Sequence, residues 1–190
     1  MFLPAVAAAL ALLATACGSG TGETGGGNDP EVTESHDADQ PDHTTGHDQM
    51  HEPDATPADQ LDGAEVRTGE FELLDTAPPE SNEVAGQVWV AEHDDGTTVT
   101  VRMSGMEPGT DYLLHLHEQA CDEDAGGDHF KFDPEGSDDP PNEVHLSFTA
   151  EGNGEGGATV TNDQRVGDDA QSIVIHPADA MDNRIACAGY

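Results

Sequence analysis

The sequence predicts an all-β domain that follows an acidic N-terminal region of low complexity. From about residue 66 the chain is a series of short segments rich in Val, Ile and Thr, and turn residues separate them. No segment in this part repeats apolar residues at the spacing of a helix. Seven or eight short strands with such turns are typical of a Greek-key sandwich or a flattened barrel.

The predicted strands can be followed in order along the chain. Segments 84–91 and 97–103 alternate apolar and polar residues, and the intervening 92–96 ends in Asp-Asp-Gly, which is typical of a β-hairpin. The remaining strands are 112–118 after a turn at 103–109, then 144–149 and 158–161 on either side of the glycine-rich turn 151–157, and finally 172–176 and 184–187.

The first residues are typical of an export signal. Residues 1–16 are almost wholly apolar, and Leu13-Ala-Thr-Ala-Cys17 resembles the lipobox of a bacterial lipoprotein, in which Cys17 carries the lipid. A transmembrane anchor is the alternative, but the stretch is shorter than the roughly 20 residues that span a bilayer. We therefore expect an extracytoplasmic lipoprotein, anchored to the membrane through Cys17 at the cell surface or in the periplasm.

Residues 17–65 are expected to form a disordered linker, because they contain almost no large apolar side chains to bury. A histidine-rich tract interrupts this acidic stretch. Such a tract can bind copper or zinc weakly and pass it to a site downstream. The alternative is a solvated linker whose histidines have no role. The tract comprises His36, His43, His47, Met50 and His51.

The charge of the chain excludes two classes of partner. With 40 acidic and 5 basic residues, the formal net charge is −35. Nucleic-acid binding requires clustered Lys and Arg, and so does peripheral attachment to an anionic membrane surface. We therefore expect neither.

Four histidines carry the strongest chemical signal. His115 and His117 lie two residues apart in the apolar segment 112–118, and on a strand this spacing places both imidazoles on one face. His129 and His176 belong to separate segments that the fold must bring together. Sites rich in nitrogen ligands suit copper or zinc, and a roughly planar set of four nitrogens favours Cu(II).

Two further cysteines remain once Cys17 is assigned to the lipid. Cys121 and Cys187 are a pair suited to one disulfide in an exported protein. The alternative is two unpaired, buried thiols.

The order of four motifs resembles the copper/zinc superoxide dismutase family over residues 66–190. The resemblance implies an eight-stranded Greek-key β-barrel, copper ligands at His115, His117, His129 and His176, an intrasubunit disulfide between Cys121 and Cys187, and an active-site arginine at Arg184. The motifs are Leu114-His-Leu-His-Glu118, Ala125-Gly-Gly-Asp-His-Phe130, Ser172-Ile-Val-Ile-His176 and Arg184-Ile-Ala-Cys-Ala-Gly189.

Two departures from the family pattern resemble its copper-only branch. Between His129 and His145 the chain has no further histidine, and His145 stands near the family's zinc-binding aspartate. Together with a carboxylate such as Asp133, these residues fall short of four zinc ligands, so zinc is doubtful and His145 is at most part of a residual zinc site. Only residues 177–183 separate His176 from Arg184, which leaves no room for the family's electrostatic loop.

The resemblance implies copper-dependent disproportionation of superoxide to oxygen and hydrogen peroxide. Arg184 would receive the anion, and His129 would supply a proton. Without zinc, the second ring nitrogen of His129 needs another partner, for which His145 and Glu143 are the candidates. The alternative function is a non-catalytic, copper-buffering lipoprotein with the same fold.

Overall fold

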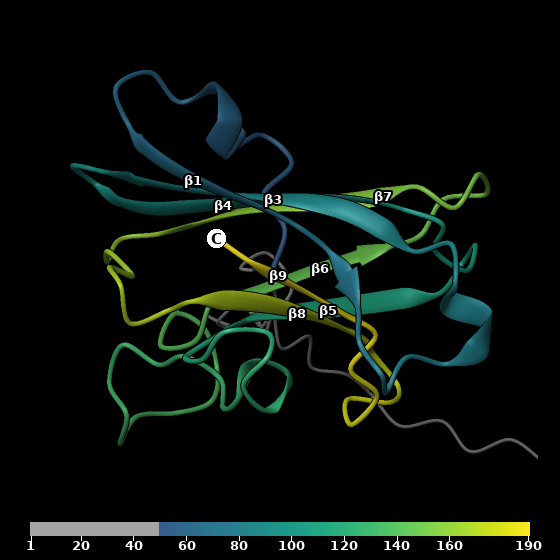
Figure 1. The fold of residues 1–190 in the computed structure, drawn as a ribbon. Coiled ribbons are helices and arrows are strands. Elements are labelled where there is room, and N and C mark those ends of the chain that lie inside the picture. Colours follow the sequence, from purple (N-terminus) through teal and green to yellow (C-terminus); the bar gives the residue numbers. More distant parts are fainter. Residues whose placement is uncertain (1–49) are drawn as a thin grey trace, which may run out of the picture. The chain divides into compact units, whose positions relative to one another are not determined.

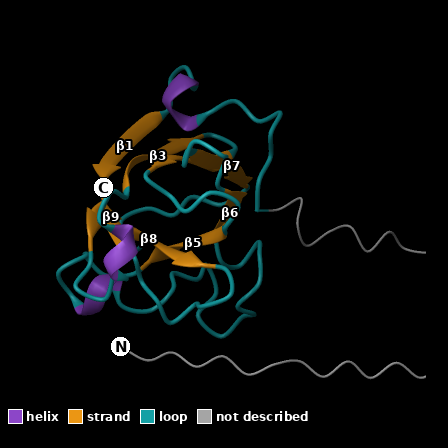
Figure 2. Ribbon diagram, turned by 90° about the vertical axis from the view of Figure 1, so that its right-hand side faces the viewer, coloured by secondary structure: helices purple, strands orange, loops and turns teal. Residues whose placement is uncertain are grey.

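The computed structural model describes residues 50–190, which form two antiparallel β-sheets packed face to face (Figure 1 and Figure 2). The first sheet has the strand order β1-β3-β4-β7 and the second has the order β2-β9-β8-β5-β6. The first contains β1 (Glu65–Glu70), β3 (Ala85–His93), β4 (Gly96–Ser104) and β7 (Gly156–Asn162). The second contains β2 (Glu72–Leu73), β5 (Asp111–His117), β6 (His145–Thr149), β8 (Ser172–Pro177) and β9 (Ala186–Gly189).

The connections between the sheets are of the Greek-key type. The chain leaves the first sheet after β4, builds β5 and β6 in the second sheet, and returns as β7 beside β4. It then crosses again to place β8 next to β5. The prediction of an all-β Greek-key fold is therefore confirmed. Only three short 3-10 helices occur among the described residues, at η1 (Ala58–Gln60), η2 (Pro79–Ser81) and η3 (Asp124–Gly126).

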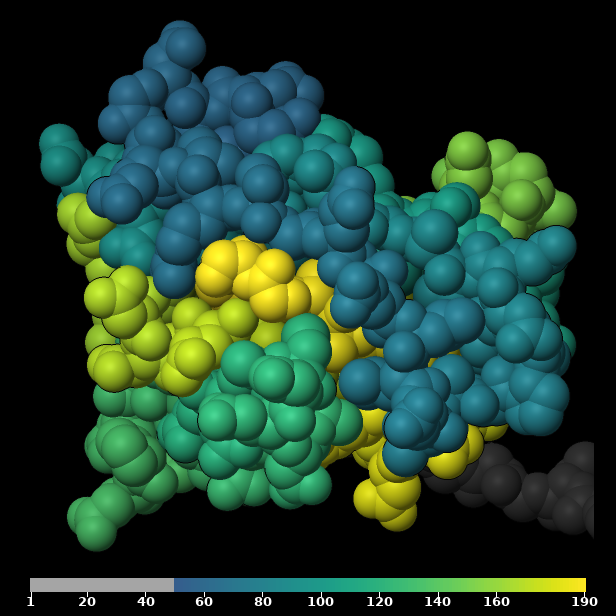
Figure 3. All heavy atoms as spheres, viewed as in Figure 1, coloured from purple at the N-terminus to yellow at the C-terminus, as the bar shows by residue number. Residues whose placement is uncertain are grey.

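Strands β1 and β2 are almost one strand. A single residue, the buried Phe71, separates them at the point where the chain passes from one sheet to the other. Counted together, they give the eight strands expected. Figure 3 shows the C-terminal end of the chain, in yellow, reaching the surface beside the blue N-terminal strands, which agrees with the pairing of β2 with β9.

The packed region begins earlier than the predicted boundary at residue 66. Ser147 in β6 donates its backbone N–H to the carbonyl of Met50, and the backbone N–H of Glu52 donates to Thr159 in β7. Further along, Ala58 is fully buried and Asp59 pairs with Arg102. Residues 50–65 pack through backbone hydrogen bonds and small side chains. Because they contain almost no large apolar residues, their composition resembles that of a linker. Residues 1–49, including Cys17, lie outside the described part of the chain.

Strand β5 is buried on both faces. Leu114 and Leu116 point into the core between the sheets, and both are at most 1% exposed. His115 and His117 point to the opposite face, where they are equally buried because the segment between β5 and β6 folds back over them. Backbone hydrogen bonds hold that segment in place, including one from Phe130 to the carbonyl of Leu116. Within residues 50–190, no helix is long and apolar enough to cross a membrane.

Candidate metal centre

The four predicted histidines meet on the outer face of the second sheet. His115 and His117 come from β5, and His176 comes from the neighbouring strand β8, where it lies opposite Leu113. His129 follows in the loop after β5 and pairs with His117 through an isolated β-bridge. One nitrogen of each ring lies within 4.8 Å of a nitrogen of every other ring.

Buried ring nitrogens without partners mark this cluster as a ligand set. Among the described residues, His115 Nδ1, His117 Nε2 and both ring nitrogens of His176 have no hydrogen-bond partner. An unsatisfied buried polar atom costs on the order of 1–3 kcal/mol, so several in one place require an explanation. Coordination of a metal ion explains one nitrogen of each ring. The residues therefore fit a site for a metal that accepts nitrogen ligands.

The protonation states agree with this assignment. Burial lowers the pKa of His117 to about 3 and that of His176 to about 4. Burial also lowers the pKa of His115, and the neighbouring His145 lowers it further. All three imidazoles are consequently neutral at neutral pH, which is the form that binds metals.

A hydrogen bond orients His117. Its Nδ1 lies 3.0 Å from the carbonyl oxygen of Gly127, so Nδ1 carries the proton and Nε2 presents its lone pair to the cluster. Gly127 has a φ of 71°, in the left-handed region that favours glycine. The preceding Gly126 packs closely over the site, because a Cβ there would lie 3.3 Å from the Cβ of His117. These two glycines let the loop cover the histidines.

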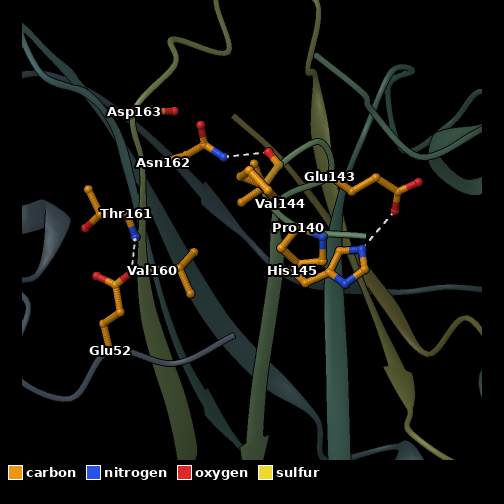
Figure 4. A pocket seen from close by; sticks show the side chains of 10 residues that line it. Glu52, Pro140, Glu143, Val144, His145, Val160, Thr161, Asn162 and Asp163 are labelled. Atoms are coloured by element: carbon orange, nitrogen blue, oxygen red, sulfur yellow. Dashed lines mark hydrogen bonds and ion pairs between the residues drawn. The ribbon is translucent and has the colours of Figure 1, made fainter. Parts of the chain in front are cut away.

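Glu143 orients the ring of His129 in the same way. Its Oε2 accepts hydrogen bonds from His129 Nδ1 at 2.8 Å and from His145 Nε2 at 2.9 Å. The Glu143 side chain is only 3% exposed. Of the two partners considered for His129, Glu143 makes the direct contact, and His145 reaches His129 only through it. Figure 4 shows the contact between Glu143 and His145 from a pocket of about 260 Å³ between β6 and β7.

The same three residues do not make a complete zinc site. His129, Glu143 and His145 form a second possible ligand group, one donor short of the usual four. The ring nitrogens of His129 and His145 both donate hydrogen bonds to one oxygen of Glu143. A zinc ion bound by these three residues would have to replace both hydrogen bonds. Asp133 instead caps its own turn, since its Oδ1 accepts the backbone N–H of Glu135.

Arg184 is anchored to the loop that covers the histidines. Its guanidinium donates to the carbonyls of Asp124 at 2.8 Å, Ala125 at 3.1 Å and Gly127 at 2.9 Å. The Gly127 carbonyl therefore accepts from both Arg184 and His117. The disulfide between Cys121 and Cys187, as predicted, links this loop to β9, close to Arg184 in the chain.

A cleft opens the site to solvent. It has a volume of about 540 Å³, and its lining includes His129, Lys131, Glu143 and Arg184. We call it the mouth cleft. His129 has a side chain that is 30% exposed, whereas His115, His117 and His176 are each at most 2% exposed. Lys131 was not expected here from the sequence, although the paucity of basic residues makes any lysine near the histidines noteworthy.

The histidine-rich tract reaches the described part of the chain only at its end. Met50 is half-buried, and exposed His51 accepts a hydrogen bond at Nδ1 from the backbone of Thr159. His36, His43 and His47 lie outside the described residues, as does Cys17.

Comparison with solved structures finds a similarity to the Cu/Zn superoxide dismutase from Brucella abortus. The two chains share 22% sequence identity with a TM-score of 0.47, and the match covers 66% of this chain and 99% of that chain. No protein-family model matches the chain, and no curated protein sequence matches it either.

The lowered pKa of His117 predicts how the metal-free protein responds to acid. In the unfolded chain His117 becomes protonated below about pH 6.5, whereas in the folded protein it stays neutral down to about pH 3. The contribution of His117 to the free energy of unfolding is therefore fully present above about pH 6.5 and is lost as the pH falls. At pH 5 this loss amounts to about 2 kcal/mol, from roughly 1.4 kcal/mol per pH unit.

The substitution His117→Gln removes the contribution of His117 to the pH dependence of stability. In urea denaturation of the metal-free protein, the loss of unfolding free energy between pH 7.5 and pH 5 should be about 2 kcal/mol smaller in the variant than in the wild type. The same pH dependence in both proteins would show that His117 is not held neutral by burial.

Proposed function

We propose that this protein is a copper-dependent superoxide dismutase. The observation that carries the proposal is the shared Gly127 carbonyl, which accepts hydrogen bonds from His117, one of the converging histidines, and from Arg184 at the mouth cleft. A metal site alone would serve storage or transfer equally well. The guanidinium of Arg184 is fixed beside the metal site, in a protein whose net charge of −35 repels anions. Such a cation is suited to binding an anionic substrate.

Copper fits the donor set. The four side chains offer only imidazole nitrogens, and a four-nitrogen site suits copper among the common metals. A bound copper ion would supply one-electron redox chemistry, by which two superoxide ions and two protons become one molecule of oxygen and one of hydrogen peroxide.

The side chains around the site would perform the remaining tasks. Arg184 attracts the anion and orients it by hydrogen bonding, and its three carbonyl contacts hold the guanidinium in position. His129 is the most exposed of the four histidines, so it can exchange a proton with solvent. Glu143 fixes the ring of His129 through Nδ1, which leaves Nε2 facing the cluster.

We further propose that the domain is tethered outside the cytoplasm through a lipid on Cys17, and that the histidine-rich tract captures metal for the site. Both proposals rest on the sequence, because residues 1–49 lie outside the described part of the chain. Export also suits the Cys121–Cys187 disulfide, since disulfides persist in oxidising compartments.

A copper-buffering lipoprotein is the alternative. The histidine-rich tract favours it, because a carrier gains from additional ligands. Arg184 distinguishes the two functions, since a carrier has no need of a cation beside its metal.

Metal content and dismutase activity, measured on the same samples, test the proposal. The wild-type protein should bind one equivalent of copper and disproportionate superoxide. His117→Ala should lose both properties, whereas Arg184→Ala should retain the copper and lose activity by about tenfold or more, as expected for removal of an electrostatic donor. Copper bound at one equivalent without activity would support the carrier instead.

The acidic surface predicts an unusual dependence on salt. A strongly negative protein repels superoxide, and salt screens that repulsion over a Debye length of about 10 Å at 0.1 M. The kcat/KM of the copper-loaded protein should therefore rise with ionic strength at moderate salt concentrations. A monotonic fall would mean that local attraction at the mouth cleft outweighs the field of the whole molecule.

A further inference from the structure

The basic residues of this protein are distributed unevenly. The chain has four arginines and a single lysine, and all five lie in the described part. Arg67 and Arg165 both pair with Glu92, and Arg102 pairs with Asp59. The remaining two, Arg184 and Lys131, line the mouth cleft. In a chain with eight times more acids than bases, two of five cations gather at one opening.

Lys131 is held at this opening by two carboxylates. Its ammonium group contacts Asp138 and lies 4.0 Å from Glu143 Oε1, while the other oxygen of Glu143 accepts the hydrogen bond from His129. An isolated β-bridge between Lys131 and Glu143 fixes the backbone of both residues. The contact between Lys131 and Asp138 is an ion pair between an ammonium and a carboxylate.

The balance of charge at the mouth cleft depends on Lys131. Four carboxylates line the cleft, from Glu118, Asp128, Asp138 and Glu143, against the two cations. Loss of Lys131 would leave Arg184 alone among them. Two unit charges about 10 Å apart in water change a rate by about a factor of two, and the factor grows at shorter distances and lower dielectric.

We propose that Lys131 is the second cation of the anion entrance, and that Asp138 restrains its position and weakens its attraction for the substrate. The identity of the anion as superoxide rests on the function proposed above. The position of the positive charge at the cleft follows from the contacts of Lys131 and does not depend on that function. Removal of the charge of Lys131 and removal of the charge of Asp138 should therefore change the rate in opposite directions.

Three variants test the proposal through kcat/KM of the copper-loaded protein at low ionic strength. Lys131→Met should lower it about threefold or more, and Lys131→Arg, which keeps the charge, should restore most of it. Asp138→Asn should raise it above the wild-type value. All of these differences should shrink as salt is added, because they arise from charge.

Matched controls separate local effects from net charge. Arg102→Gln removes one positive charge from the other sheet, and Asp95→Asn removes one negative charge from the exposed turn between β3 and β4. Both should stay close to the wild-type rate. If Lys131→Met matches Arg102→Gln, or if Asp138→Asn matches Asp95→Asn, Lys131 has no special part in guiding the anion.

A second readout does not depend on activity. Because Lys131 is the only lysine, its side-chain Cε signal is unambiguous in the NMR spectrum of the metal-free protein. Titration with azide, a small monovalent anion, should shift this signal at constant ionic strength, and Asp138→Asn should tighten the binding. An unmoved signal would overturn the proposal. If azide shifts this signal in the metal-free protein while the copper-loaded protein has no dismutase activity, the anion entrance stands and superoxide is rejected as its substrate.

Discussion

The burial of β5 on both faces is the constraint on which the site depends. Leu114 and Leu116 fill the core between the sheets, and each fully buried leucine contributes roughly 1.5–3 kcal/mol through the hydrophobic effect. A register shift by one residue would exchange the leucines for the histidines, so the apolar face of β5 also fixes where His115 and His117 point. Core packing thereby determines the direction of two metal ligands, and the pairing of β5 with β8 adds His176 on the same sheet.

The loop over β5 converts these histidines into a defined site. The Gly127 carbonyl accepts from both His117 and Arg184, so one backbone group sets the tautomer of a ligand and the position of a cation. The Cys121–Cys187 disulfide ties the same loop to β9. On the other side, Glu143 orients His129 and also contacts Lys131. Two acceptors, one carbonyl and one carboxylate, thus couple the ligands to the charges that face solvent.

Much of this arrangement could be predicted from the sequence, for physical reasons that differ between residues. The two-residue periodicity of a strand places His115 and His117 on one face, and the count of cysteines indicates a disulfide. The sequence offers Glu143 and His145 as candidate partners of His129 but does not choose between them, and it does not predict the role of Lys131. Both depend on a β-bridge within an irregular segment, which brings Glu143 and Lys131 together. The packing of residues 50–65 was also missed, because it uses backbone hydrogen bonds and the small side chain of Ala58.

The central claim is that His115, His117, His129 and His176 together form one copper site. Electron paramagnetic resonance of the protein loaded with one equivalent of Cu(II) tests it most directly, with histidine labelled with ¹⁵N to identify the donors. Coupling to four histidine nitrogens is predicted, with loss of this signal in His117→Ala. A spectrum dominated by oxygen ligands, or one that His117→Ala leaves unchanged, would contradict the account and place the copper elsewhere in the protein.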